Sequence, residues 1–279
     1  MRIIDVKQIE EAVYRMALKA GVGVTESCAQ ALRRAAEEET SNSAKFALET
    51  TLKNLRIAQE NRMPVCQDTG MAIVILEIGC DVYLSGGVVG SAVNQAVRRA
   101  YRDGYFRKSV CDPITRKNTG DNTPAVVHTE IVEGDKVKIY YLPKGFGSEN
   151  MSRLYMLKPA QGVEGIIDSV VETVRLAGSR PCPPVYVGVG VGGTFDSCAY
   201  LSKRALLRDV GQLSLDPAVA EIERTCLEKI NALGIGAQGF GGKVTALGVS
   251  VLTAPTHIAG LPVAVNVQCH CVRCEKVEL

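Results

Sequence analysis

The order of apolar and polar positions predicts a mixed α/β protein that opens with helices. Apolar residues at helical spacing predict three amphipathic helices within about the first 62 residues, and Ile9, Val13 and Met16 share one face of the first. Thr25 is placed to cap the second helix, and the third is expected to begin near Ser43. The chain therefore begins with a helical portion.

Helices and strands alternate over the remaining residues. The apolar run AIVILEI at 72–78 is typical of a strand buried on both faces. Residues 125–142 are predicted to form a β-hairpin that turns at Glu133-Gly134-Asp135. Further helices are expected to open at Ser91 and to cover 162–178, 197–208 and 217–233, and further strands 184–193, 243–252 and 261–268. This order favours one α/β unit over residues 1–279, with a mixed and partly antiparallel sheet.

Composition narrows the class of protein. The chain has 279 residues, of which 46% are hydrophobic, enough for a sizeable core. Its 32 basic and 30 acidic residues nearly balance, and it has five Phe and no Trp, which argues against nucleic acid as a partner. The first residues are charged throughout and no apolar run approaches the roughly 18 residues of a membrane span, so we expect a cytosolic protein.

Ten cysteines in a reducing compartment favour metal binding or catalysis over disulfides. Free cysteines also serve as small buried hydrophobes, and we expect that role for Cys28, Cys80 and Cys226. The tail CHCVRC contains Cys269, Cys271 and Cys274 and resembles half of a zinc site, although no second C-x-x-C accompanies it.

Two glycine-rich stretches resemble nucleotide-binding loops only superficially. Gly188, Gly190 and Gly193 fit G-x-G-x-x-G, but no second strand leads to Asp209, so we interpret these glycines as allowing a close backbone approach. GAQGFGGKV fails as a phosphate-binding loop, because the pattern requires Gly at Ala237 and Ser or Thr at Val244. Lys243 is either a functional cation or an ordinary solvated lysine.

Six stretches together carry a family resemblance. Cysteines occur at chain junctions in PVCQDTG (64–70), in RPCPPVYVGVGVGGTFD (180–196) and at the end of PTHIAGLPVAVNVQCH (255–270), although their separations carry no information alone. These stretches, with FRKSVCDPITRKNTGDNTPAVVH, PKGFGSEN and GAQGFGGKVTALGV, resemble the class I, iron–sulfur fumarate hydratases and the related L-tartrate dehydratases. The whole chain is similar to the α subunit of the two-subunit form.

The resemblance implies a [4Fe-4S] cluster held by Cys66, Cys182 and Cys269. Three ligands leave one iron open, and this iron can act as a Lewis acid toward a hydroxy-diacid. In such a site Asp68 would protonate the leaving hydroxide, with its pKa tuned by His257. The residues expected to bind substrate are Gln67, Arg107, Gly145 and Gly147.

Two departures from the family pattern leave questions open. Phe146 replaces a glycine that family members commonly carry, so the amide that reaches substrate is undecided. Cys271 and Cys274 are extra thiols near Cys269 that could protect, compete with or replace it, or simply be buried.

The resemblance also implies a β subunit that carries the threonine base and further Arg and Lys residues. We therefore expect an α2β2 assembly and no turnover by this chain alone. Hydration of fumarate to malate is favoured over tartrate dehydration, although no residue decides between them. An iron–sulfur or zinc sensor is the alternative from another class, and Asp68, His257 and Arg107 argue against it. A hydride-transfer enzyme is the third interpretation.

Overall fold

The computed structural model describes all 279 residues, and the contacts divide them into two compact units, each described here by itself. Unit 1 comprises Met1–Val24, Asn54–Phe146 and Arg273–Leu279, and unit 2 comprises Thr25–Lys53 and Gly147–Val272. The sequence analysis expected one unit. Alternation of helices and strands does not reveal which strands share a sheet, and here each unit has a four-stranded sheet of its own.

The elements follow the predicted mixed α/β order. Those of unit 1 are β1 (Arg2–Asp5), α1 (Val6–Val22), β2 (Met71–Gly79), β3 (Val82–Ser85), α4 (Val89–Asp103), β4 (Val126–Val132), β5 (Val137–Lys144) and β10 (Glu275–Glu278). Those of unit 2 are α2 (Glu26–Glu38), β6 (Arg153–Leu157), η1 (Pro159–Gln161), α6 (Gly162–Ala177), β7 (Val185–Gly193), α7 (Phe195–Ala205), α8 (Pro217–Asn231), η2 (Ala237–Gly239), β8 (Ala246–Thr256) and β9 (Leu261–Gln268). The chain passes between the units four times: after Val24, within α3 (Asn42–Asn61), within α5 (Phe146–Glu149) and after Val272. No helix has the length and apolar character needed to span a membrane.

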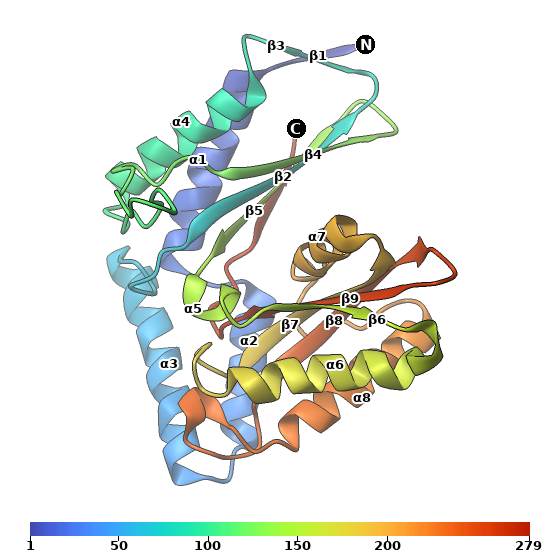
Figure 1. Cartoon of the computed structure of the whole chain (residues 1–279). Coiled ribbons are helices and arrows are strands. Elements are labelled where there is room, and N and C mark those ends of the chain that lie inside the picture. Colours follow the sequence, from blue (N-terminus) through green and yellow to red (C-terminus); the bar gives the residue numbers. More distant parts are fainter. The chain divides into compact units, whose positions relative to one another are not determined.

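The sheet of unit 1 has the strand order β10–β5–β2–β4 (Figure 1). The predicted hairpin of β4 and β5 is wrong, because β2 lies between them, parallel to β4 and antiparallel to β5. The uniformly apolar β2 takes the central position, where both of its edges are paired. The expected turn does form, but it crosses the end of β2, where a Cβ on Gly79 would lie 2.2 Å from the Gly134 carbonyl oxygen.

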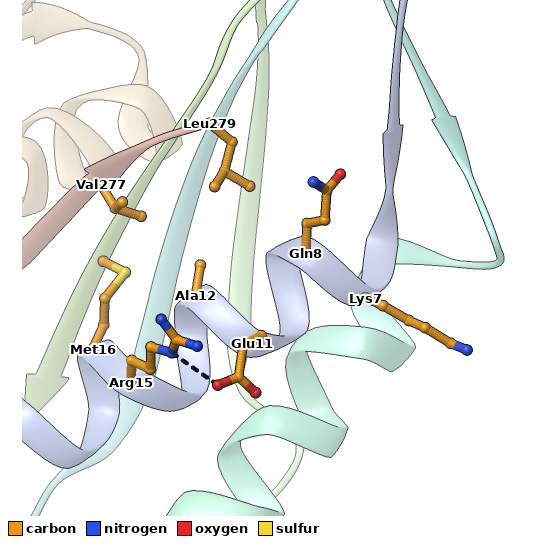
Figure 2. Close-up of a pocket in the computed structure, with 8 residues that line it drawn as sticks. All are labelled: Lys7, Gln8, Glu11, Ala12, Arg15, Met16, Val277 and Leu279. Carbon is orange, nitrogen blue, oxygen red and sulfur yellow. Dashed lines mark hydrogen bonds and ion pairs between the residues drawn. The ribbon is translucent and has the colours of Figure 1, made fainter.

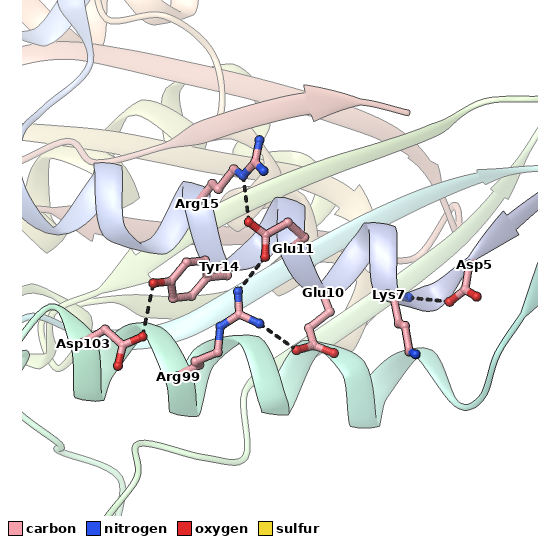
Figure 3. A network of polar contacts seen from close by, with 8 residues as sticks. All are labelled: Asp5, Lys7, Glu10, Glu11, Tyr14, Arg15, Arg99 and Asp103. Carbon is pink, nitrogen blue, oxygen red and sulfur yellow. Dashed lines mark hydrogen bonds and ion pairs between the residues drawn. The ribbon is translucent and has the colours of Figure 1, made fainter.

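Helices α1 and α4 cover one face of this sheet. Ile9, Val13 and Met16 are buried there, as the helical spacing predicts. Figure 3 shows the polar network that joins the two helices: Arg99 of α4 contacts Glu10 at 3.2 Å and Glu11 at 2.5 Å, and its guanidinium lies 3.9 Å from the Tyr14 ring centroid. Hydrogen bonds from Arg15 and Arg99 lower the pKa of Glu11.

The sheet of unit 2 has the order β6–β9–β7–β8, with β8 parallel and β9 antiparallel to β7 (Figure 1). The valines of β7 pack into a core with α6 and α8. Its glycines pack against α7: a Cβ on Gly188 would lie 2.3 Å from the Ser202 carbonyl oxygen, and one on Gly190 would lie 2.2 Å from that of Cys198. The close backbone approach expected of these glycines is therefore confirmed, and the backbone they approach is that of α7.

Candidate active site

The PVCQDTG loop connects α3 to β2 in a conformation fixed by backbone hydrogen bonds. The Val65 N–H donates to the Gly21 carbonyl at 3.0 Å, and the buried Tyr101 hydroxyl donates to the carbonyls of Thr69 (3.0 Å) and Gly70 (2.7 Å). Gly70 has a φ of +89°, and a Cβ there would lie 2.8 Å from the Pro143 carbonyl carbon. The loop therefore requires glycine at the position where the strand begins.

Asp68 is held by two backbone donors, one on each carboxylate oxygen. Oδ1 accepts the Gly70 N–H at 3.0 Å and Oδ2 accepts the Phe146 N–H at 2.8 Å. The Asp68 carbonyl also accepts a hydrogen bond from Arg273 Nη2 at 3.0 Å. The bond from Phe146 joins PVCQDTG to PKGFGSEN, and the Phe146 amide is therefore directed at Asp68. A Cβ on Gly145 would lie 3.2 Å from Oδ2, so the approach depends on glycine.

Gly145→Ala is expected to displace Asp68 and to destabilise unit 1. A carbon 3.2 Å from Oδ2 is overpacked, and such strain typically costs about 1–3 kcal/mol. Urea unfolding of the purified chain measures this cost. Gly90→Ala is the matched control, because a Cβ there meets nothing within 4 Å. A Gly145→Ala chain as stable as the wild type would show that Asp68 can accommodate the added methyl group without a loss of free energy of unfolding.

Arg107 and Gln67 also belong to unit 1, and both side chains are exposed. The Arg107 carbonyl accepts the Thr69 hydroxyl at 2.8 Å, so the structure brings the backbone of YFRKS to the loop. Sequence reasoning missed Asn122, which is fully buried: its Nδ2 donates to the Gly70 carbonyl at 3.1 Å and its Oδ1 accepts the Ser109 N–H at 2.7 Å. Its place within the matched GDNTP stretch is the signal that could have identified it.

Cys182 and Cys269 are brought together within unit 2. Cys182 precedes β7, Cys269 follows β9, and the next residue, His270, contacts the Cys182 carbonyl through its ring Nδ1 at 2.9 Å. Burial, and after it the neighbouring Cys269 thiolate, raises the pKa of Cys182. Gly147 lies close to the segment that precedes Cys182, since a Cβ on Gly147 would be 3.8 Å from the Arg180 carbonyl oxygen.

His257 lies at the other end of the same sheet. Thr256 pairs with Gly193 at the end of β7, whereas Gln268 pairs with Tyr186 near its beginning. Seven residues of strand separate these positions, a distance of about 23 Å. The exposed His257 ring accepts the Ala259 N–H on Nδ1 at 3.1 Å, which leaves its hydrogen on Nε2. Within one chain, His257 does not adjoin Cys182 and Cys269.

The ten thiols differ in accessibility, and the three predicted ligands are among the accessible ones. All ten cysteines are thiols rather than disulfides; Cys66 and Cys269 are partly exposed and Cys182 is exposed. Burial raises the pKa of Cys28 and of Cys226 to about 12, so these two are buried protonated thiols as expected. The expectation for Cys80 is wrong, because it lies exposed in the turn between β2 and β3. Accessible thiols can become thiolate ligands, a condition that the three predicted ligands meet, as do Cys80, Cys111 and Cys274. Thiolates are the donors that iron–sulfur clusters take, so the chemistry of the three predicted residues fits such a cluster.

A hollow of about 480 Å³ in unit 1 lies elsewhere (Figure 2). It is bordered by α1 and the C-terminal strand, through residues such as Arg15, Val277 and Leu279. None of the predicted site residues lines it, so it is not a candidate for the active site.

Comparison with known proteins identifies the class. Residues 10–278 match the family model described as fumarate hydratase (fumerase), a family of hydro-lyases. The chain belongs to this class I fumarate hydratase and tartrate dehydratase family, as an α subunit.

Several similar proteins are named as tartrate dehydratase subunits. A Methanocaldococcus jannaschii protein, named provisionally as an L(+)-tartrate dehydratase α subunit, is 41% identical over 269 residues, which cover 94% of each chain. The L(+)-tartrate dehydratase α subunits of Escherichia coli strains UTI89 and K12 are each 31% identical over 268 residues, covering 95% of this chain and 88% of theirs.

Proposed function

We propose that the chain is the α subunit of an L(+)-tartrate dehydratase, which removes water from tartrate to give oxaloacetate. The observation that carries this choice is the 41% identity to a protein of that name over nearly the whole chain. The family resemblance favoured hydration of fumarate, whereas the names of the relatives support the alternative, dehydration of tartrate. Hydration of fumarate is the second candidate, supported by the description of the family model.

Cys66, Cys182 and Cys269 would hold the [4Fe-4S] cluster in this proposal. When bound, the cluster supplies a Lewis acid for the departing hydroxyl group. The alternative of a sensor protein is less well supported, because the chain belongs to a family of enzymes. The cytosolic location expected from the sequence stays a prediction.

Asp68 would donate the proton that converts the departing hydroxide to water. The Gly70 and Phe146 amides fix the plane of its carboxyl group, and each oxygen keeps a lone pair that can carry a proton. Gln67 and Arg107, whose side chains are exposed, would bind substrate carboxylates. Backbone amides near Gly145 and Gly147 stay candidates for further contacts, and the Phe146 amide is already bonded to Asp68.

His257 would act in the site of a second α chain. Its position about 23 Å along β7 from the Cys182 end excludes a role beside the Cys182 and Cys269 of its own chain. The expected α2β2 assembly contains two α chains, and a symmetric pair can exchange such residues. The β subunit would supply the base that removes the proton α to a carboxylate.

Initial rates with both substrates test the proposal. The co-purified α–β complex is expected to form oxaloacetate from L(+)-tartrate with a higher kcat/KM than it hydrates fumarate, and the α chain alone is expected to turn over neither. A complex that hydrates fumarate but leaves tartrate unchanged would favour the second candidate. Turnover by the α chain alone would contradict the need for a β subunit.

A further inference from the structure

Cys182 has a backbone conformation that the surrounding residues must maintain. Its φ is +54°, in the left-handed region that non-glycine residues avoid. Such a conformation is unfavourable for a residue with a Cβ and persists only where neighbouring contacts impose it. The contacts that surround it therefore decide where the exposed thiol points.

Two residues bind the consecutive carbonyls of Cys182 and Pro183. Gln238 donates to the Pro183 carbonyl twice, from its backbone N–H at 2.8 Å and from its side-chain Nε2 at 3.0 Å. His270 binds the Cys182 carbonyl twice, from its backbone N–H at 3.4 Å and from its ring Nδ1 at 2.9 Å. Four hydrogen bonds from two distant segments therefore converge on consecutive carbonyl oxygens.

The His270 ring must carry a hydrogen on Nδ1 to make its contact. The Cys182 carbonyl oxygen can only accept, so the 2.9 Å contact requires a donor on the ring. The Gln238 amide lies 3.2 Å from the same ring nitrogen, and one of its hydrogens is committed to Pro183. The ring and the amide are therefore neighbours, and each is bonded to one of the two carbonyls.

The loop that carries Gln238 is itself anchored. Gln238 has a φ of +53° among glycines with positive φ, a conformation that fixes its amide toward Pro183. The buried Glu39 accepts the Lys243 N–H on Oε2 at 2.8 Å and the Thr40 N–H on Oε1 at 2.8 Å. The glycine-rich stretch is therefore a rigid support rather than a phosphate-binding loop.

We propose that Gln238 and His270 are positioning residues that clamp the Cys182 backbone and present its thiol to the iron–sulfur cluster. This inference rests on the proposed function, because it assumes that Cys182 is a ligand. It assigns a role to the GAQGFGG stretch and to the histidine after Cys269. Outer contacts of this kind commonly change metal affinity by about 10–100-fold when they are removed.

Anaerobic release of iron to a chelator tests the clamp on the reconstituted chain. Gln238→Ala and His270→Gln are expected to release iron at least about tenfold faster than the wild type. His270→Asn keeps a donor at the position of Nδ1 and is expected to stay near the wild-type rate. Gln212→Ala is the matched control, since Gln212 is exposed and makes only a backbone hydrogen bond to Asp209.

Hydrogen exchange of the cluster-free chain provides the second readout. The Cys182 N–H donates to the Ser179 carbonyl at 3.1 Å, and its exchange is expected to accelerate in Gln238→Ala and His270→Gln but not in His270→Asn. Unchanged exchange and iron release in all variants would overturn the clamp. A wild-type chain that binds no iron and sulfide would overturn the proposed ligand role instead, and exchange at Cys182 would still decide whether the clamp exists. A loss of thermal stability without either local change would indicate an ordinary structural role.

Discussion

Replacement of Asp68 by Asn is expected to lower kcat of the α–β complex by about 10²–10⁴-fold, the usual contribution of a general acid. The amide cannot donate an acidic proton to the leaving hydroxide. It also places an N–H₂ group against one of the two backbone donors, from Gly70 or Phe146, that the carboxylate now accepts. Initial rates with tartrate and the visible spectrum of the cluster are the measurements.

Two comparisons separate chemistry from loss of structure. Asp135→Asn, in the exposed turn between β4 and β5, is a matched change that is expected to leave kcat unaltered. The unfavourable amide contact is expected to reduce the free energy of unfolding of the Asp68 variant by about 1–3 kcal/mol without unfolding it. An Asp68→Asn complex with an intact cluster and wild-type kcat would remove Asp68 from its proposed role.

Co-expression of two inactive α chains is expected to restore activity. In a two-fold symmetric pair, an Asp68→Asn chain beside a His257→Asn chain forms one site with both side chains intact and one site with neither. Random pairing then gives about a quarter of the wild-type activity, whereas each variant expressed alone stays inactive. Activity of the co-expressed complexes, assayed together without separating the mixed pairs, measures this directly.

The co-expression result distinguishes a His257 that acts in the site of the other α chain from one that acts in the site of its own chain. If His257 served the site of its own chain, no combination of the two variants would contain an intact site. No recovery from mixed complexes would therefore contradict the exchange of His257 between chains, and full activity of His257→Asn alone would remove it from the mechanism. Recovery near a quarter would support both the role and its source.

Glu39 gives a prediction for stability as a function of pH. Burial alone would raise its pKa, but hydrogen bonds from the backbone of Ser41, Lys243, Thr40 and Val244 outweigh burial and lower the pKa from 4.5. Because folding lowers this pKa, the stabilisation is present above about pH 4.5 and is lost as the pH falls through the folded value. Glu39→Gln is therefore expected to be less stable than the wild type by about 1–3 kcal/mol at pH 7, with a gap that narrows below pH 4.5.

Urea unfolding of the cluster-free chain between pH 7 and pH 3 measures the Glu39 effect. Glu37→Gln, an exposed change on the same helix, is the control and is expected to follow the wild type throughout. A gap between wild type and Glu39→Gln that stays constant down to pH 3 would show that the carboxylate form of Glu39 does not stabilise the fold.

Local patterns in the sequence predicted most of the individual elements. Thr25 accepts the Cys28 N–H as a helix cap, and β2 is buried along nearly its whole length. Both features could be predicted because each depends on the types of a few consecutive residues. Strand pairing is not local: the 133–135 turn marks a reversal of the chain but does not indicate that β2 lies between the strands it joins. The contacts that divide the chain into two units are likewise long-range, and local sequence patterns do not show them.

The sequence offers candidate site residues but not their arrangement. The family resemblance supplied Cys66, Cys182 and Cys269 as ligands, which stay predictions, while the structure brings the last two together. The distance from His257 to these cysteines follows from the register of β7, β8 and β9, which no spacing in the sequence reveals. The hydrogen bond from the Phe146 amide to Asp68 could not be predicted either, because every residue except proline has a backbone N–H and the residue type does not indicate where it points.

Anaerobic iron and sulfide content of the purified chain, followed by EPR after addition of tartrate, tests the central claim most directly. The account predicts about four irons and four sulfides per chain and a reduced-cluster signal that tartrate perturbs. Zinc without sulfide, after reconstitution has been attempted, would instead indicate a site made by the tail cysteines and would contradict Cys66 and Cys182 as ligands.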